Sequence, residues 1–343
     1  MRALIINNIG TPDDFDSEAV GDYLNEFLMD PDIISIPYPL RWLLVKRIIV
    51  PRRKSSSSSK YRKVWTEEGS PLLMWTRRFI ESLKRELDTS WTIQVGMRYG
   101  NPGTRLALER AREAGATEIY FAPMYPQWAR ATTGSAIAEV IRQMKKMGWT
   151  APLKVLRPFY RDEKFLDSVA SRIGDKVRPN DVVLFSYHGL PESQVKKTPG
   201  CLRSGSCCDR AESGNFLCYR AHCLWTTRYL VHRLGLDESR WRLSFQSRLG
   251  SSKWLGPATD DVLRELGGEG KSVVVACPSF VADCLETLEE IGMDGRRDYL
   301  AAGGSRFEMV DCPNSDEGWI KNFAGIVVDD RSWTEAQRLL SGG

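Results

Sequence analysis

A histidine at the end of a buried strand is the residue best suited to proton transfer in this chain. Residues 181–191 read DVVLFSYHGLP, so an apolar, β-branched run ends at His188, and Gly189 and Pro191 stop the strand. In an open α/β sheet ligands bind at the carboxyl ends of the strands, so this imidazole is expected to face a crevice. A histidine with an ordinary pKa of about 6.5 is largely neutral near pH 7 and can accept a proton. The other two histidines, His222 and His232, lie in a helical stretch and are expected at the surface.

Three carboxylates follow a second buried strand pattern at 272–277. A helix is predicted over 283–291, and Asp283, Glu286 and Glu290 occupy positions i, i+3 and i+7 on one of its faces. Such an acidic face is usually just solvated, and like charges at this spacing destabilise an isolated helix by about 0.2–0.5 kcal/mol per pair. Because these acids begin at the mouth of a strand, they could instead form a line that holds a hard cation or passes protons.

Composition narrows the class of protein. The chain has 343 residues, of which 42% are apolar and 27% charged, as in a soluble α/β enzyme. A net charge of +4 is too small to favour nucleic acid as a partner. Met1 leads directly into a strand pattern, which argues against a signal peptide, and no apolar stretch reaches the roughly 18–20 residues of a transmembrane helix. We therefore expect a cytoplasmic protein whose eight cysteines are thiols or metal ligands.

Strand and helix patterns alternate along the chain, which predicts doubly wound parallel sheets. No GxGxxG fingerprint opens a helix, which argues against a dinucleotide site. Two Rossmann-like halves are expected, 1–155 and 156–343. The predicted strands are 2–9, 92–99, 118–124, 153–159, 181–188, 241–247 and 272–279, and the predicted helices include 104–114, 135–147, 162–174, 260–266 and 283–291.

The segment 34–65 interrupts this alternation. Tryptophan and aliphatic residues are interleaved with arginines and lysines between 37 and 54, and five serines follow at 55–59. One interpretation is an amphipathic surface helix followed by a mobile, low-complexity loop. The other is a lip over a binding cleft, and a basic amphipathic helix of this kind can also lie on an anionic membrane surface.

A cysteine-rich insertion, 199–223, follows the histidine motif. Five of the eight cysteines lie in it: Cys201, Cys207, Cys208, Cys218 and Cys223. Thiolates grouped on a glycine-containing loop are typical of a soft-metal site, either zinc or an iron–sulfur cluster.

Five stretches, taken together and in order, resemble the ferrochelatases, the enzymes that insert ferrous iron into a porphyrin. They are 6–12 (INNIGTP), 125–135 (YPQWARATTGS), 186–191 (SYHGLP), 244–257 (SFQSRLGSSKWLGP) and 280–290 (FVADCLETLEE). The resemblance covers almost the whole chain and implies two Rossmann-like halves with a porphyrin cleft between them. It implies protoporphyrin IX and Fe²⁺ as substrates and protohaem as the product. Peripheral contact with the inner face of the membrane is a further expectation.

The resemblance also implies roles for particular residues. His188 and Glu286 are the expected catalytic residues and contacts of the substrate iron, and Asp283 and Glu290 are expected to pass protons or metal. Positions expected to contact the porphyrin are Ile9, Arg53, Tyr61, Ser70, Arg98, Tyr99 and Trp254.

Some members of the family carry a [2Fe–2S] cluster, and the insertion is the expected place for it. Relatives without a cluster often have a cysteine near Cys223, which leaves Cys201, Cys207, Cys208 and Cys218 as the four expected ligands. Adjacent Cys207 and Cys208 would strain a single cluster, so Cys223 is an alternative ligand. Zinc, free thiols and a disulfide remain open alternatives.

Two other functions remain open from the sequence. One is a chelatase that acts on coproporphyrin or on a cobalamin precursor. The other is a non-catalytic iron–sulfur or haem-binding protein on the same fold, against which the pair His188 and Glu286 argues.

Overall fold

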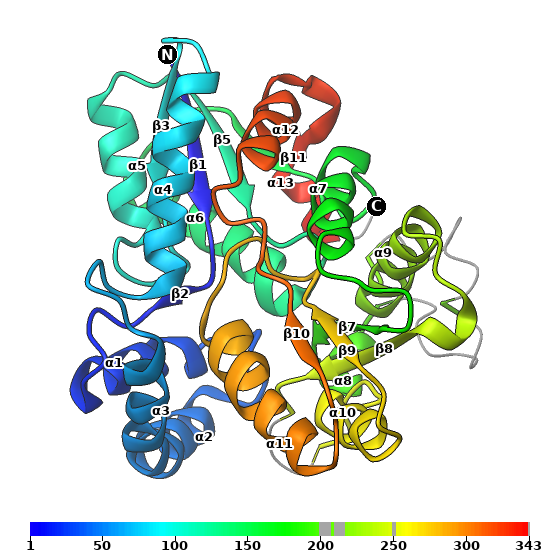
Figure 1. Ribbon diagram of the computed structural model, residues 1–343. Coiled ribbons are helices and arrows are strands. Elements are labelled where there is room, and N and C mark those ends of the chain that lie inside the picture. Colours follow the sequence, from blue (N-terminus) through cyan, green and yellow to red (C-terminus); the bar gives the residue numbers. More distant parts are fainter. Residues whose placement is uncertain (199–206, 209–216, 249–251, 342–343) are drawn as a thin grey trace. The chain divides into compact units, whose positions relative to one another are not determined.

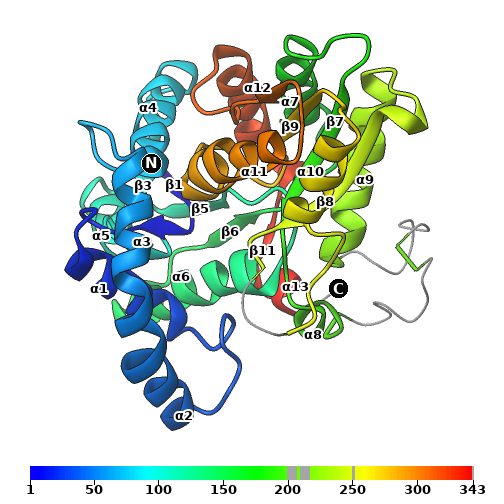
Figure 2. The same ribbon diagram turned by 60° about the horizontal axis from the view of Figure 1, so that its bottom comes forward.

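The computed structural model describes residues 1–198, 207–208, 217–248 and 252–341 (Figures 1 and 2). The chain forms two compact units. The first comprises Met1–Tyr125, Ala129–Arg157 and Ser315–Gly343, and the second comprises Pro126–Trp128 and Pro158–Asn314.

The first unit is built on a five-stranded sheet in the order β11-β6-β5-β1-β3. The strands are β1 (Arg2–Asn7), β3 (Trp91–Val95), β5 (Glu118–Pro123), β6 (Leu153–Leu156) and β11 (Trp333–Glu335). All pairs are parallel except β11 with β6 at the edge. Leu4, Ile5 and Ile6 are completely or almost completely buried, as expected for a strand covered on both faces.

The second unit has a four-stranded parallel sheet in the order β10-β9-β7-β8. Its strands are β7 (Val182–His188), β8 (Trp241–Gln246), β9 (Val273–Ala276) and β10 (Phe307–Met309). One side of its core is formed by Val182, Leu184, Val273 and Val275. Tyr299, on the helix that directly precedes β10, packs on them.

The two sheets share one strand order. In each, the first strand along the chain (β1 or β7) has the second strand on one side (β3 or β8) and the third and fourth on the other. The connections therefore reverse direction at β1 and at β7. Ligands bind beyond the carboxyl ends of the strands at such a switch point, so the fold itself selects the residues after β1 and at the end of β7.

Helices fill the connections in both units. In the first unit they are α1 (Ser17–Leu28), α2 (Tyr38–Leu43), η1 (Leu44–Ile49), α3 (Val50–Val64), α4 (Pro71–Glu86), α5 (Thr104–Glu113), η2 (Arg130–Gly134), α6 (Ser135–Lys146), α12 (Glu317–Val328), η5 (Asp330–Ser332) and α13 (Ala336–Ser341). In the second unit they are α7 (Glu163–Gly174), α8 (Glu192–Val195), α9 (Tyr219–Arg233), η3 (Glu238–Arg240), α10 (Thr259–Gly268), η4 (Glu286–Gly295) and α11 (Arg296–Ala301). All seven predicted strands are confirmed, with shorter ends, and β10 and β11 were not predicted.

The predicted second half, 156–343, is too long at its end. Residues 315–343 belong to the first unit because β11 pairs with β6 and α12 packs against α4. Phe79 of α4 lies 5.2 Å from Phe323 and 6.1 Å from Trp319, measured between ring centroids.

The serine run was expected in a loop, but it lies inside α3. Serine is only about 0.5 kcal/mol less favourable than alanine in a helix, so tertiary packing can determine whether a serine-rich segment is helical. Helix α3 packs against α1, and the buried Ser58 donates its Oγ–H to the Phe15 carbonyl at 2.7 Å. Together α2, η1 and α3 form helical structure from Tyr38 to Val64.

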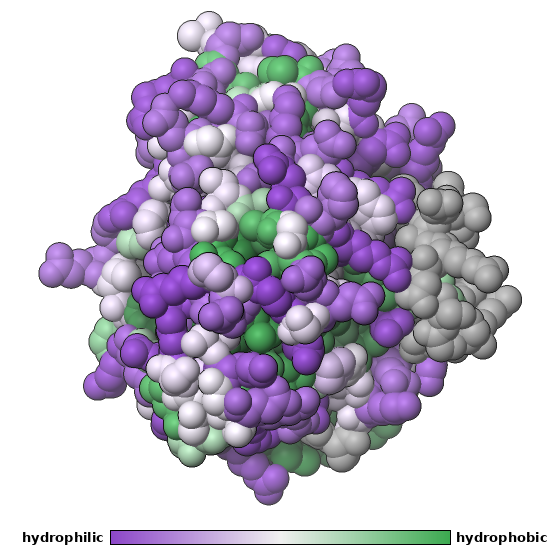
Figure 3. All heavy atoms as spheres, turned by 45° about the vertical axis from the view of Figure 1, so that its right-hand side comes forward, coloured by the Kyte–Doolittle hydropathy of each residue, from purple (hydrophilic) through white to green (hydrophobic). Residues whose placement is uncertain are grey.

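Hydrophilic residues cover most of the face drawn in Figure 3. Within the described residues, no helix is both long enough and apolar enough to cross a membrane.

Candidate active site

His188 is the last residue of β7 and is half-buried. Its Nδ1 lies 2.7 Å from the carbonyl oxygen of Gly189. A carbonyl oxygen can only accept a hydrogen bond, so in the neutral ring Nδ1 carries the proton and Nε2 keeps the lone pair. Gly189 has no room for a side chain, because a Cβ would lie 2.6 Å from the Gln246 carbonyl oxygen. Position 189 therefore requires glycine, and the contact with its carbonyl leaves Nε2 as the proton acceptor.

Only Glu286 and Glu290 of the three predicted carboxylates lie on a helix, and it is of a different kind from the one predicted. Helix η4 is a π-helix that begins at Glu286, and Asp283 precedes it. The prediction of one α-helical face carrying all three acids is therefore wrong. The main-chain N–H of Asp283 donates to Asn314 Oδ1 at 2.8 Å, which takes it out of a helical arrangement. π-Helices are rare and often occur at functional sites.

Glu290 is held by one residue at the end of β8. The N–H and Oγ–H of Ser247 donate to its two carboxylate oxygens at 2.7 and 2.6 Å. Ser247 adopts a φ of 66°, a left-handed conformation that is unusual for serine, and this turns both donors toward Glu290. Burial raises the pKa of Glu290, while the Ser247 hydrogen bonds and the charge of His188 oppose the rise and Glu286 adds to it. His188, Glu286 and Glu290 therefore form one interacting group.

Asp283 is used within the protein. It is 3% exposed, and its Oδ2 accepts from Asn314 Nδ2 at 2.7 Å. Its Oδ1 accepts from the hydroxyl of Thr287 at 3.0 Å and from the N–H of Cys312 at 3.3 Å. Asp283 thus anchors the chain before η4, and a part in a proton or metal path would require these bonds to break.

In the first unit, the residues after β1 are tied to those after β3. The short strands β2 (Gly10–Thr11) and β4 (Tyr99–Gly100) pair in parallel. Gly10 has a φ of +102°, and a Cβ there would lie 1.7 Å from the Tyr99 carbonyl oxygen, so only glycine fits. The main-chain N–H of Arg98 donates to the Asn8 carbonyl at 2.8 Å. The paired residues 8–11 and 98–100 are called the strap below. Ile9, which is half-buried, lies in it next to Arg98.

The guanidinium of Arg98 is held by a buried acid and a hydroxyl. It bonds to Asp30, and its Nε donates to Ser135 Oγ at 2.7 Å. Burial alone would raise the pKa of Asp30, but hydrogen bonds from Ser135 and the Asp32 amide and the charge of Arg98 bring it below its ordinary value. The hydroxyl of Tyr99 also donates to Asp30, at 2.8 Å. Glu139 also lies 3.9 Å from Nη1 of Arg98, so the direction of this guanidinium is fixed within the first unit.

The other predicted porphyrin contacts differ in exposure. Arg53 is exposed on α3, whereas Tyr61, Ser70 and Tyr99 are buried. The Ser70 hydroxyl accepts from the Leu73 N–H as the N-cap of α4, which explains this serine structurally. In the second unit, a Cβ added at Gly189 would lie 3.3 Å from the indole of Trp254. Trp254 therefore lies beside the end of β7.

Several residues of the site were not predicted, although a search for polar residues at the ends of buried strands could have found them. Gln246 ends β8 and donates from Nε2 to the Glu286 carbonyl at 3.0 Å, and it accepts from Ser186 at 2.8 Å. Like His188, it is a polar residue at the end of a buried strand. Ser247 and Ser279 follow the ends of β8 and β9, and the same criterion selects both.

The other histidines lie on α9 as predicted, but only His232 is exposed. His222 is 1% exposed and stacks on Tyr160, with ring centroids 3.7 Å apart. Its Nδ1 accepts from the main-chain N–H of Trp128 at 3.0 Å.

The cysteine-rich insertion is only partly described. Cys201 lies outside the described residues. Cys207 and Cys208 have their sulfurs 3.7 Å apart, and Cys208 also interacts with Cys218, which together with burial raises the pKa of the Cys208 thiol. Among the described residues there is no group of three or more histidine, cysteine or acidic side chains placed to hold a metal ion.

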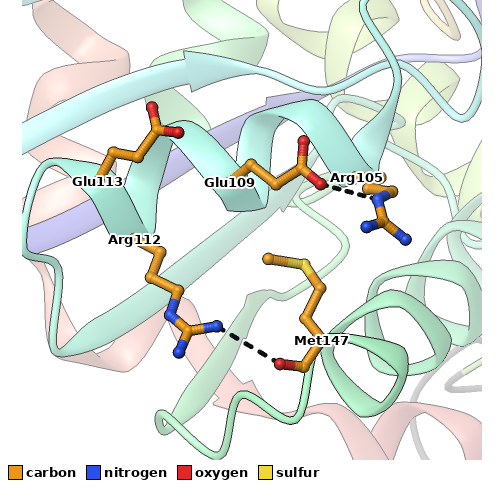
Figure 4. A pocket seen from close by; sticks show the side chains of 5 residues that line it. All are labelled: Arg105, Glu109, Arg112, Glu113 and Met147. Atoms are coloured by element: carbon orange, nitrogen blue, oxygen red, sulfur yellow. Dashed lines mark hydrogen bonds and ion pairs between the residues drawn. The ribbon is translucent and has the colours of Figure 1, made fainter.

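A surface pocket of about 420 Å³ lies elsewhere in the first unit (Figure 4). It is lined by Arg105, Glu109, Arg112, Glu113 and Met147. Arg105 pairs with Glu109 at 2.8 Å, and Arg112 donates to the Met147 carbonyl at 3.4 Å. With two positive and two negative side chains and one apolar residue, it does not suit a large apolar ligand.

The fold is that of the chelatases. Two structures of SirB from Bacillus subtilis, one with Fe³⁺ and one a sirohydrochlorin chelatase in complex with cobalt, have TM-scores of 0.53 and 0.54. They are 12% and 11% identical to this chain, and each comparison covers 99% of this chain and 96% of the other. At such identity the likeness establishes the fold alone.

The sequence then identifies the family. The profile of the ferrochelatase family matches residues 1–331. Ferrochelatase from Bdellovibrio bacteriovorus is 44% identical, covering 95% of this chain and 98% of the relative, and that from Azotobacter vinelandii is 40% identical over the same shares. The chain belongs to the ferrochelatase family, the lyase-type chelatases that insert iron into porphyrin in haem biosynthesis. The resemblance seen in the sequence is confirmed, and iron insertion is favoured over the alternative functions.

Proposed function

We propose that this chain inserts Fe²⁺ into protoporphyrin IX to form protohaem, with His188 as the base. The observation that carries this proposal is the Nδ1 contact with the Gly189 carbonyl, which leaves the Nε2 lone pair free. Each pyrrole N–H bond breaks so that the nitrogen keeps the electron pair and the proton passes to Nε2. Two protons leave and Fe²⁺ takes their place, so no net electron transfer occurs.

The carboxylates of η4 complete the mechanism. Glu286 lies at the start of the helix and faces the same group of charges as Glu290 and His188. We assign to Glu286 and Glu290 the transfer of protons away from His188 and the guidance of Fe²⁺, a cation that carboxylate oxygens and imidazole can both bind. Asp283 supports this arrangement through Asn314 and Thr287.

Substrate binding is assigned to residues that the family resemblance selected. Arg98 and the exposed Arg53 are proposed to bind propionate carboxylates, because a guanidinium can engage both oxygens. Ile9 and Trp254 are proposed to contact the ring itself, since both are partly exposed and apolar. Tyr99 orients Asp30 and Arg98, and direct ring contacts by Tyr61, Ser70 and Tyr99 stay predictions.

The porphyrin can be tested directly. Anaerobic protein is mixed with Fe²⁺ and either protoporphyrin IX, coproporphyrin or a cobalamin precursor, and metallation is followed by absorbance. We expect the highest kcat/KM with protoporphyrin IX. Faster metallation of coproporphyrin, or of the cobalamin precursor with cobalt, would assign another substrate, and no metallation of any would contradict the proposal.

We further propose that the cysteine-rich insertion binds a [2Fe–2S] cluster. The sulfurs of Cys207 and Cys208 lie 3.7 Å apart, Cys208 also interacts with Cys218, and Arg220 partly offsets the rise in the pKa of the Cys208 thiol. A cluster would crosslink a segment with few apolar residues and so stabilise its fold. Its ligands would come from Cys201, Cys207, Cys208 and Cys218, with Cys223 as the alternative.

Protein purified without oxygen should then be reddish-brown and contain about two irons per chain. Cys208→Ser should bleach the colour, because a hydroxyl is a poor ligand for iron–sulfur sites. Cys312→Ser, outside the insertion, is the matched control and should keep the colour. Colourless, fully active protein that contains zinc or no metal would contradict the cluster and leave the chelatase assignment intact.

We also propose that α2 and η1 make peripheral contact with an anionic membrane surface. Tyr38, Leu40 and Leu43 are 62%, 59% and 52% exposed, and the basic Lys46 and Arg47 lie one turn further on. Exposed apolar groups next to cations suit an interface of anionic lipids. Binding to vesicles of anionic lipid should be lost in Leu40→Ser/Leu43→Ser and absent for vesicles of zwitterionic lipid, whereas equal binding of the variant would contradict the proposal.

A further inference from the structure

Two hydroxyl groups hold the backbone of His188. The hydroxyl of Tyr219, the first residue of α9, donates to the His188 carbonyl at 2.7 Å. The His188 N–H donates to the Oγ of Ser279 at 3.1 Å. Both polar groups of the His188 main chain are therefore bound by side chains from other segments of the second unit.

The three residues close a ring of hydrogen bonds. Ser279 also hydrogen-bonds the hydroxyl of Tyr219. With Ser279 as the donor in that contact, the Tyr219 hydroxyl can donate to the His188 carbonyl while Ser279 accepts from the His188 N–H. Tyr219 is 7% exposed, and a tyrosine hydroxyl can donate one hydrogen bond and accept another.

The ring occupies a place that the sheet leaves open. The pairing of β7 with β9 runs from Val182 to Phe185 and stops there, because β9 ends at Ala276. On the other side, β7 remains paired with β8 as far as His188 and Gln246. The end of β7 would thus be held from one side alone without Tyr219 and Ser279.

We propose that Tyr219 and Ser279 are positioning residues that fix the direction of the His188 imidazole. The direction of Nε2 depends on the His188 backbone and on the contact between Nδ1 and the Gly189 carbonyl, and both move if the carbonyl of His188 is released. Neither residue touches the reacting atoms. The inference rests on the proposed role of His188 as the base.

The first test is kinetic and uses Tyr219→Phe, with Tyr229→Phe on the same helix as the control. A misplacement of about 1 Å can cost roughly 100-fold in rate, so we expect kcat to fall by about 10- to 100-fold, with the porphyrin KM within about 2-fold. The pH dependence of kcat should also change, which a loss of folded protein alone would not cause. Tyr229→Phe should keep the wild-type profile. An unchanged kcat and pH profile in Tyr219→Phe would overturn the proposal.

The second test observes the imidazole directly. The chain has only three histidines, so ¹⁵N-histidine labelling gives three sets of ring signals, and His188→Ala identifies those of His188. In the wild type we expect the Nδ1–H tautomer for neutral His188. In Tyr219→Phe its signals should shift toward a mixture of tautomers, while the exposed His232 stays unchanged. Unaltered His188 signals would overturn the proposal even if turnover fell.

Ser279 provides a rescue experiment. Ser279→Ala should lower kcat as Tyr219→Phe does, and Ser279→Thr, which keeps the hydroxyl, should restore it. Because both residues belong to one ring, the double variant should cost little more than the worse single variant. Additive losses would show that the two residues act separately. If His188→Ala kept full turnover, the base assignment would fail, and the histidine spectra would still decide whether the ring holds His188.

Discussion

At the scale of single residues, the site depends on which atom of a side chain is left free. Burial alone does not make His188 a base. The Gly189 carbonyl accepts a hydrogen bond from Nδ1–H of His188, and Ser247 donates hydrogen bonds to both carboxylate oxygens of Glu290. The sequence located His188 from the end of its strand, but the tautomer follows from the contact between Nδ1 and the Gly189 carbonyl. That contact depends on the backbone conformation at His188 and Gly189, which residue patterns do not encode.

His188→Ala removes the proposed proton acceptor. We expect metallation to fall at least about 100-fold, at the low end of general acid–base catalysis, while porphyrin binding remains within about 2-fold. Single-turnover metallation and fluorescence titration with porphyrin measure the two quantities. His232→Ala, at an exposed position of α9, is the control and should behave as the wild type. Near-full turnover by His188→Ala would remove this residue from the mechanism.

Glu290→Gln should change the pH dependence of stability. Burial raises the pKa of Glu290 above its ordinary 4.5, so the folded protein binds this proton more tightly than the unfolded chain does. The stability from this group is present below the unfolded pKa and is lost as pH rises through the folded pKa. Glutamine does not titrate, so the variant should gain free energy of unfolding relative to the wild type as pH rises from 4.5 toward neutrality. Urea unfolding at several pH values measures this, and a difference that stays constant with pH would contradict it.

At the scale of elements, the site depends on backbone features that residue patterns describe poorly. Apolar periodicity predicted a helix after β9, but not that η4 is a π-helix beginning at Glu286. Its start depends on the bond between Asp283 and Asn314, which are 31 positions apart. The same limit explains α3, where the contact of Ser58 with Phe15 joins segments 43 positions apart.

The pairing of β2 with β4 in the strap can be tested at Gly10, where only glycine fits. Gly10→Ala would place a methyl group 1.7 Å from the Tyr99 carbonyl oxygen at a φ of +102°. Backbone strain of about 1–2 kcal/mol adds to the steric overlap, so we expect a loss of at least roughly 3 kcal/mol in stability. Gly115→Ala, at a φ of +76° with nothing within 4 Å, should cost only the strain. Equal losses in the two variants, measured by chemical unfolding, would contradict the role of the strap.

At the scale of the whole molecule, the first unit is assembled from both ends of the chain. Sequence alternation identified seven of the parallel strands, and the central strands β1, β7 and β9 among them are largely apolar runs bounded by turns. It missed β10, a parallel strand of only three residues. It also missed β11, whose three residues are too few for a pattern and whose place depends on pairing with β6. Trp333 of β11 packs edge-on against Tyr120 of β5, with ring centroids 4.9 Å apart. The chain's last residues are thus part of the first core.

Phe323→Ala tests this assembly. Phe323 is fully buried on α12, and its ring lies 5.2 Å from Phe79 and 5.3 Å from Trp319. Removing a buried phenylalanine costs about 3–5 kcal/mol, and here the loss should fall on the first unit. Hydrogen exchange should accelerate in α4 and β6, which precede the substitution by well over a hundred residues, before it accelerates in β7 or β9. Val328→Ala, on the same helix at a position 62% exposed, should change stability by less than about 0.5 kcal/mol. Faster exchange first in β7 and β9 would place α12 with the second unit and contradict the assignment.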